Sequence, residues 1–256
     1  MNQSGFFTTA FDLLQKFWPS LLLGVRTTLI VAILGTGFGF IIGLIVGGIK
    51  AIQLDFASSN IKKVCKKVFD VCASLYIGVF RGTPMMVQAV FIYYALLNVI
   101  HWDKMTAAIF VISINTGAYM AEIIRAGIQA VDKGQVEAAR SLGLSNLQTM
   151  MTIVLPQAIR NVFPAIGNEL IVNIKDSSVL MIISITELMF EAKSIAGTTY
   201  HFTETYFNVA LIYLILTTIA SIVLNFIEKK MNTVPSSFPQ SVTDPENMKF
   251  SSRGNS

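Results

Sequence analysis

Five long apolar runs decide how this chain can fold. A run of about twenty apolar residues is long enough to cross the hydrocarbon core of a bilayer as a helix. In lipid a helix satisfies its own backbone hydrogen bonds, which an isolated strand or loop cannot do. Only 13% of the residues are charged, against about 25% in a typical soluble domain. The sequence therefore predicts an all-α membrane protein with five transmembrane helices. They cover about Leu21–Ile49, Val71–Ile100, Met105–Ile124, Val162–Ile185 and Tyr206–Ile227.

The two ends of the chain differ in composition from the spans. We expect no cleaved signal peptide, because residues 1–18 lack a basic n-region and the first apolar span is too long for an h-region. The aromatic residues of the N-terminal segment suit a headgroup boundary. The sequence predicts an extracellular interfacial segment over 1–18 and a transmembrane domain over 19–230. Residues 231–256 have too few apolar side chains to fold and are expected to form a disordered cytoplasmic tail.

Basic residues gather in alternate loops. Lysines crowd the loop after the first span, more basic residues lie between 125 and 160, and Lys229 and Lys230 follow the fifth span. The opposite loops hold little more than Lys16, Lys104 and Lys193. Because cytoplasmic loops are the ones enriched in Lys and Arg, we expect the 125–160 loop and the C-terminus inside and the N-terminus outside. Five crossings give the same result.

The polar loop between the third and fourth spans has a defined pattern. Glu137-Ala138-Ala139 is followed after three residues by Gly143, and after nine more by Ile153, with Leu155-Pro156 closing the segment. Small alanines allow another surface to approach closely, and glycine permits a sharp turn. The pattern predicts a shaped cytoplasmic loop that contacts a partner.

Arg81-Gly82-Thr83-Pro84 interrupts the second span at membrane depth. Pro84 removes a backbone donor and restricts Thr83, so carbonyls are left that need partners. An arginine inside a membrane is costly unless it pairs or faces a cavity, which makes it a functional candidate. A structural kink with Arg81 paired to a carboxylate is the alternative.

The fourth span carries three charged residues, Glu169, Lys175 and Asp176. Glu169 and Asn173 are four residues apart and share one helical face. Polar groups gathered near one depth favour a polar cavity over isolated ion pairs. An amino acid zwitterion needs an anion for its ammonium group and a cation for its carboxylate, which Glu169 and Arg81 could supply. The predicted substrate-binding residues are Arg81, Thr83, Glu169, Asn173 and Ser177.

No motif for enzyme chemistry is present. The nearest match to a phosphate-binding loop, 43–50, lacks the Gly-Lys-Ser/Thr ending, and neither His-Glu-x-x-His nor Gly-x-Ser-x-Gly occurs. Cys65 and Cys72 would lie roughly 10 Å apart along a helix, too far for a disulfide, and no further metal ligands stand nearby. We expect no catalytic residue, no metal site and no cofactor in this chain.

Glycine recurs at every fourth position of the first span, at Gly35, Gly39, Gly43 and Gly47. Such a strip lets a second helix approach closely. It either packs statically or slides between two states, and static packing is favoured because glycine is common in membrane helices.

Four further charged residues lie near the ends of spans. Glu122 and Arg125 are interpreted as a solvated or interfacial pair. Glu187 and Glu191 are interpreted as a solvated external face, with contact to a ligand-delivering protein as the alternative.

Three blocks of the sequence resemble the permeases of bacterial ATP-binding-cassette (ABC) importers, in the branch that takes up polar amino acids. The blocks are Tyr76–Gln88, Gly117–Leu144 and Leu155–Leu188, within a resemblance that covers about Leu21 to Lys230. The resemblance implies the type I importer permease fold in a bacterial inner or plasma membrane. It also implies two copies of a separate ABC ATPase that holds ATP and Mg, a second permease as homodimer or heterodimer, and an extracellular substrate-binding protein. No nucleic acid is expected.

The resemblance also implies roles for particular residues. A short helix in the polar loop would dock into the ATPase, so that ATP binding drives alternating access. Glu169 is similar to the glutamate of family members that hold a ligand within the membrane, and the missing second acid near Asn173 weakens the case for arginine or lysine as cargo. Glutamine, a basic amino acid, histidine and cystine stay open. The ATPase-coupling residues would be Glu137, Ala138, Ala139, Arg140, Ser141 and Gly143.

Two other classes of function compete with a polar-amino-acid importer. A stand-alone secondary transporter or channel for a small polar solute would leave the 137–143 loop without a task, and the sequence shows no inverted repeat. A membrane scaffold for a cytoplasmic partner would have no use for charges inside the second and fourth spans.

Overall fold

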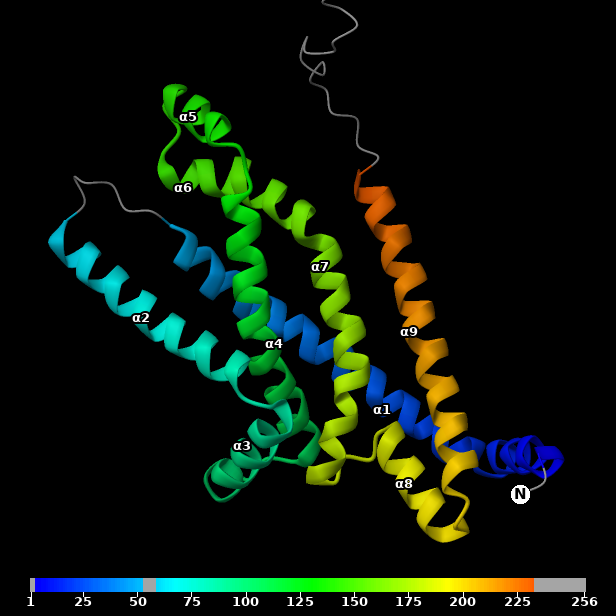
Figure 1. Cartoon of the computed structure of the whole chain (residues 1–256). Coiled ribbons are helices and arrows are strands. Elements are labelled where there is room, and N and C mark those ends of the chain that lie inside the picture. Colours follow the sequence, from blue (N-terminus) through cyan, green and yellow to red (C-terminus); the bar gives the residue numbers. More distant parts are fainter. Residues whose placement is uncertain (1–2, 53–58, 233–256) are drawn as a thin grey trace, which may run out of the picture.

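The structure, a computed structural model, describes residues 3–52 and 59–232, whose regular elements are all helical (Figure 1). The α-helices are α1 (Gln3–Ala51), α2 (Asn60–Gly82), α3 (Met85–Ile100), α4 (Lys104–Gln129), α5 (Lys133–Ser141), α6 (Asn146–Thr149), α7 (Leu155–Asp176), α8 (Leu188–Thr199) and α9 (Phe202–Asn232). A π-helical segment, η1 (Met150–Val154), joins α6 to α7, and a 3₁₀ segment, η2 (Ser177–Ile183), follows α7.

Three single helices, α1, α4 and α9, are long and apolar enough to cross a bilayer. Helices α2 and α3 meet this test only together, with a bend of 114° at the break between them. The predicted interruption of the second span is therefore confirmed. By length and composition the described residues hold up to four spans, one fewer than the five expected from the sequence.

The fourth expected span is the one that does not qualify. Most of its residues fall in α7, which ends at Asp176, and in η2, which follows it. Helix α7 has 22 residues, enough for a hydrocarbon core of about 30 Å, but it carries Glu169, Lys175 and Asp176. It packs against α1, α4 and α9. Charged residues of membrane helices face the interior of the bundle or a water-filled cavity. In α7, Glu169 and Asp176 are half-buried and Lys175 is exposed.

Helices α1 and α4 form the most extensive helix pair of the described chain. A Cβ atom added at Gly43 would lie 2.3 Å from Met120, and one added at Gly47 would lie 2.4 Å from the backbone oxygen of Ala121. Real side chains do not tolerate such distances. The structure thus confirms that the glycine strip of the first span is a close helix contact.

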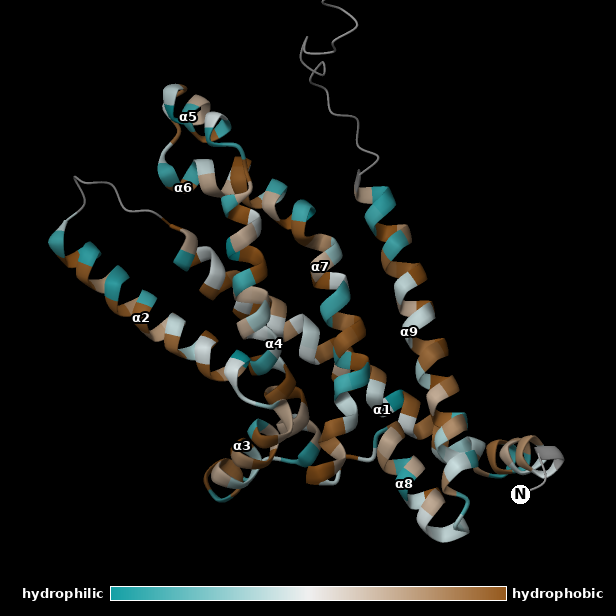
Figure 2. Cartoon of the chain, viewed as in Figure 1, coloured by the Kyte–Doolittle hydropathy of each residue, from teal (hydrophilic) through white to brown (hydrophobic). Residues whose placement is uncertain are grey.

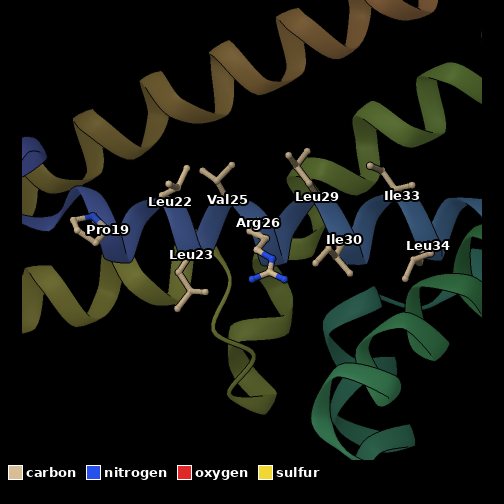
Figure 3. A pocket seen from close by; sticks show the side chains of 9 residues that line it. All are labelled: Pro19, Leu22, Leu23, Val25, Arg26, Leu29, Ile30, Ile33 and Leu34. Atoms are coloured by element: carbon tan, nitrogen blue, oxygen red, sulfur yellow. The ribbon is translucent and has the colours of Figure 1, made fainter.

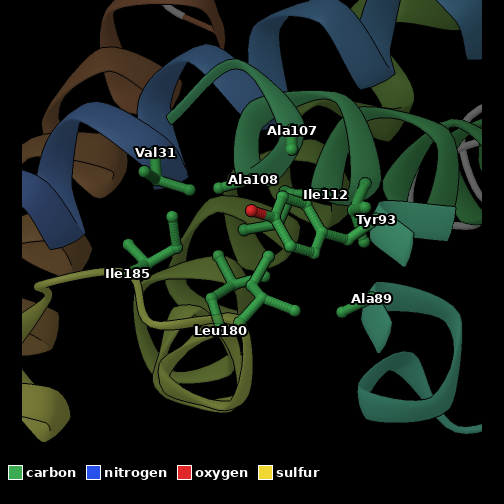
Figure 4. Packing of buried hydrophobic residues seen from close by; sticks show 10 residues of the cluster. Val31, Ala89, Tyr93, Ala107, Ala108, Ile112, Leu180 and Ile185 are labelled. Carbon is green, nitrogen blue, oxygen red and sulfur yellow. The ribbon is translucent and has the colours of Figure 1, made fainter. Parts of the chain in front are cut away.

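A buried apolar cluster holds α3 and η2 against the α1–α4 pair (Figure 4). Val31 comes from α1, Ile112 from α4, Tyr93 from α3 and Leu180 from η2, and none of these side chains is more than 8% exposed. The cluster fixes the bent second span to the remainder of the bundle.

The two ends of the bundle differ in polarity. Helices α5 and α6, the start of α2 and the end of α9 lie at one end and are the more hydrophilic, whereas the N-terminus and α8 lie at the other (Figures 1 and 2). Residues 3–18, expected as a separate interfacial segment, form the beginning of α1, and the Nδ2 of Asn208 donates to the Ala10 oxygen at 2.7 Å. Phe7 and Phe11 are exposed there. Of the expected tail, Met231 and Asn232 end α9, and the rest lies outside the described residues.

Replacing Gly43 with alanine should destabilise the protein by about 1–3 kcal/mol, because the new methyl group overpacks the contact with α4. The matched control is Gly37→Ala in the same helix, where no atom lies within 4 Å of an added Cβ. Alanine favours a helix over glycine by about 0.5–1 kcal/mol, so the control should be neutral or stabilised. Thermal unfolding in detergent measures both, and equal transition temperatures would contradict the close α1–α4 contact.

Candidate functional site

The corner of the broken span is held by side-chain amides. Thr83 is extended between α2 and α3, and its hydroxyl donates to the Val79 oxygen at 2.8 Å. The Nε2 of Gln88 donates to the Phe80 oxygen at 2.9 Å and to the oxygen and hydroxyl of Thr83 at 3.0 and 2.7 Å. The Nδ2 of Asn115 donates to the Oε1 of Gln88 at 2.8 Å and reaches the Phe80 oxygen at 3.3 Å. The carbonyls that Pro84 leaves without partners are satisfied in this way.

Arg81 ends α2 one residue before the break and is exposed in the single chain. Its guanidinium lies over the ring of Tyr119, 5.2 Å from the centroid, a cation–π contact. Across residues 3–52 and 59–232 it forms no ion pair within 4.0 Å. The kink exists, but its arginine is not neutralised by a carboxylate at contact distance.

Two of the polar residues predicted in the fourth span are used inside the protein. Asn173 is 3% exposed, and its Nδ2 donates to Thr36 at 2.7 Å and to Thr116 at 3.0 Å. It thereby links α7 to α1 and α4. Ser177 is fully buried and donates to the Ile174 oxygen at 2.9 Å.

Glu169 lies one helical turn before Asn173 and is half-buried. Within the described chain it has no hydrogen-bond or ion-pair partner. Arg81 and Glu169 thus come from two different helices, and neither forms an ion pair within the described residues. Thr83, Asn173 and Ser177 have their side-chain polar atoms bonded within the chain.

Two pockets of the described residues lie away from these charges. A cavity of about 240 Å³ lies between α7 and α9 around Gly167 and Ser221. A shallow apolar pocket of about 800 Å³ covers the outer face of α1, with Arg26 as its one charge (Figure 3). Arg81 and Glu169 line neither of these two pockets.

The polar loop forms a capped pair of short helices. Helix α5 ends in a turn at Gly143, which has a φ of +84°, with hydrogen bonds from Gly143 N to the Arg140 oxygen and from Leu144 N to the Ala139 oxygen. This is the Schellman pattern of helix ends. Ser145 then begins α6 with a reciprocal side-chain and backbone pair to Gln148. The short helix and the turn predicted at Gly143 are both confirmed.

The loop presents one face outward. Glu137, Ala138, Arg140 and Ser141 are exposed, whereas Ala139 is only 5% exposed. Leu142 and Leu147, next to these residues, are 82% and 69% exposed. Apolar side chains left in water beside a polar ridge are typical of a protein-binding surface.

The sequence interpretation placed Glu187 on a solvated face, and the structure shows that this is wrong. Its side chain is fully buried and accepts hydrogen bonds from the backbone of Met189 and Phe190 at 2.8 and 2.7 Å and from the Tyr213 hydroxyl at 3.0 Å. It is the N-cap of α8. Local sequence did not indicate this, because Tyr213 lies on a different helix. Glu191 is partly exposed.

Gln88 and Asn115 were not predicted as part of the site. The available signal was an uncharged amide inside an apolar run, four residues after Pro84 in the case of Gln88. In the described chain no group of three or more His, Cys, Asp or Glu residues could hold a metal ion.

Residues 63–233 match the family described as binding-protein-dependent transport system inner membrane component. The chain is 37% identical over 223 residues to the glutamine transport system permease protein GlnP of Escherichia coli (strain K12), covering 85% of this chain and 96% of that protein. A putative glutamine transport system permease protein of Rickettsia felis is 36% identical over 227 residues, with 86% and 98% covered.

Two solved structures are similar as well. A crystal structure of an amino acid ABC transporter with histidines matches with a TM-score of 0.74 and 38% identity, over 85% of this chain and 96% of that one. The MetNI methionine ABC transporter, in inward-facing conformations, matches with a TM-score of 0.71 at 20% identity, which shows a shared fold. This chain belongs to the family of binding-protein-dependent inner-membrane transport components and is the membrane permease subunit of an ABC importer, in which a separate subunit hydrolyses ATP.

Proposed function

We propose that this permease carries a polar amino acid, and specifically glutamine, into a bacterial cell. The observation that carries the proposal is a pair of opposite charges, Arg81 near the end of α2 and Glu169 on α7, neither of which forms an ion pair within the described residues. Their charges match the carboxylate and the ammonium group of an amino acid. The names of the relatives, which are glutamine permeases, support the choice of cargo.

In this proposal Arg81 binds the substrate carboxylate and Glu169 binds the ammonium group. Thr83, Asn173 and Ser177 have structural roles in this proposal, because their polar atoms are already bonded within the chain. A neutral substrate side chain fits this arrangement. The amide of Asn173 is bonded to Thr36 and Thr116.

The exposed face of α5 is the proposed contact with the ATPase. Glu137, Ala138, Arg140 and Ser141 form its ridge, Ala139 packs inward, and the turn at Gly143 sets the direction of α6. Helix α6 continues through η1 directly into α7, on which Glu169 lies. Movement of α5 by the ATPase, where ATP and Mg bind, would reach the substrate site through this continuous helical connection and produce alternating access.

The proposed complex contains two ATPase copies, a second permease and an extracellular substrate-binding protein. A second permease, identical or different, would enclose the charges that this chain leaves open. The α5–α6 end would face the cytoplasm and the N-terminus the outside, as the distribution of basic residues predicts. The two lie at opposite ends of the bundle (Figure 1).

Gly143→Val should prevent the ATPase from co-purifying with the permease. A β-branched residue does not adopt the left-handed backbone of Gly143 without strain of about 1–2 kcal/mol, so the α5–α6 turn should open. Glu137→Lys should weaken the same contact without altering the turn. The control is Gly48→Val, which meets no atom within 4 Å at its Cβ. Full ATPase retention in both loop variants would remove this surface as the coupling site.

Glu169→Gln should raise the KM for glutamine-stimulated ATPase activity roughly 10- to 100-fold, since a charge-assisted hydrogen bond contributes about 1.5–3 kcal/mol. Glu228→Gln, near the end of α9, is the matched control and should leave KM unchanged. The ATPase activity of the complex is followed against glutamine concentration. An unaltered KM for Glu169→Gln would exclude Glu169 from the substrate site.

Uptake into vesicles separates the importer from the secondary transporter. The permease reconstituted without its ATPase should not accumulate glutamine against a gradient, with or without an imposed ion gradient. Uphill accumulation in vesicles that lack the ATPase would favour the stand-alone transporter.

A further inference from the structure

Two buried amides, Gln88 and Asn115, connect the corner of the broken span to α4. They are 7% and 8% exposed, and each uses its donor group on the α2–α3 corner. The 2.8 Å bond between them joins α3 to α4. Without these amides the Phe80 oxygen would lose both of its side-chain donors, and a buried carbonyl without a partner is costly.

The same two residues bond to the backbone on either side of Arg81. Its neighbour Phe80 is held through the backbone oxygen by both amides, and Thr83, two residues after it, is held by Gln88. The guanidinium itself rests on Tyr119, one helical turn after Asn115 on α4. The backbone beside Arg81 and the Arg81 side chain are therefore both held against the same face of α4.

We propose that Gln88, together with Asn115, is a positioning residue that fixes where the Arg81 guanidinium meets the carboxylate of the substrate, and thereby sets the preference of the permease for substrates with a free α-carboxylate. This inference rests on the proposed function, in which Arg81 binds that carboxylate. A bidentate arginine–carboxylate contact depends on geometry, so a corner that shifts by a fraction of an ångström loses affinity for the carboxylate and not for the rest of the substrate.

A role in stability alone predicts a different result. If the amides only held the fold together, their loss would lower the amount of intact complex and weaken all ligands alike. Selectivity between two ligands that differ only at the α-carboxylate separates the two roles.

The experiment compares L-glutamine with its α-carboxamide, in which the carboxylate is replaced by a neutral amide. Both compete for labelled glutamine bound to the purified permease–ATPase complex. In the natural protein the α-carboxamide should bind on the order of tenfold more weakly or worse. In Gln88→Met, which keeps the volume of the side chain, glutamine should weaken while the α-carboxamide does not, so that the two bind within about threefold of each other.

Three further variants make the result decisive. Asn98→Leu, an exposed amide on the same helix α3, should retain the preference of the natural protein. Asn115→Leu leaves the bonds of Gln88 to the corner in place, should reduce the preference in part, and decides the question if Gln88→Met does not fold. Arg81→Leu should abolish the preference.

The outcomes separate this inference from the proposed function. If Arg81→Leu keeps the preference, the assignment of Arg81 to the carboxylate is wrong. If Arg81→Leu loses it while Gln88→Met and Asn115→Leu keep it, the assignment of Arg81 stands and the positioning role is overturned. Equal weakening of both ligands in Gln88→Met also overturns the positioning role.

Discussion

A backbone carbonyl in a membrane has no water to accept a hydrogen bond from, so a helix can be broken there only where other donors replace its own. The break between α2 and α3 meets this condition with three side chains. Thr83 donates to the turn before it, and the amides of Gln88 and Asn115 take the carbonyls at the corner. The 114° bend and the place of Arg81 beside α4 both follow from these bonds. Arg81 can lie beside this break because side-chain hydrogen bonds stabilise the carbonyls of the corner.

A second set of side-chain hydrogen bonds, again made by a buried amide, joins helices in the interior of the bundle. Asn173 joins α7 to α1 and α4 through the hydroxyls of Thr36 and Thr116, and one turn away the half-buried Glu169 forms no ion pair within the described residues. Buried amides that hold helices together therefore lie only a few residues from charged side chains that form no ion pair. Neutral amides suit the first task because their burial costs less than that of a charge. A half-buried carboxylate next to a fixed amide has a defined position.

Local features of the fold were predictable from the sequence. The spacing of the glycines in α1, the break at Pro84 and the turn at Gly143 each depend on residues close together in the chain. Features that depend on distant partners were not. Asn173 could not be assigned to Thr36 across 137 positions, and the burial of Glu187 depends on Tyr213 in a later helix.

The same limit applies to the fourth span and to the candidate site. Helix α7 was expected as a transmembrane span that carries charges, but it does not qualify as a span by length and composition. Its packing against α1, α4 and α9 joins residues that are far apart in the chain. Arg81 and Glu169 were found from the cost of charge in a membrane, which is a property of single residues. Which polar neighbours have their atoms bonded inside the chain, as Thr83 and Ser177 do, is known only once the helices are packed.

The positions of the glycine strip of α1 are of two kinds, which differ in whether the facing atoms of α4 belong to a side chain or to the main chain. This difference decides how each position can change during evolution. At Gly35 the two nearest facing atoms are the Cγ2 and Cβ of Ile112, so a larger residue on α1 can be matched by glycine at 112 on α4, which removes both atoms. At Gly47 the facing atoms are the main chain of Ala121, which no exchange on α4 can remove. During evolution a larger residue can therefore be accommodated at Gly35 by a change on α4, whereas no change of side chain on α4 can accommodate one at Gly47.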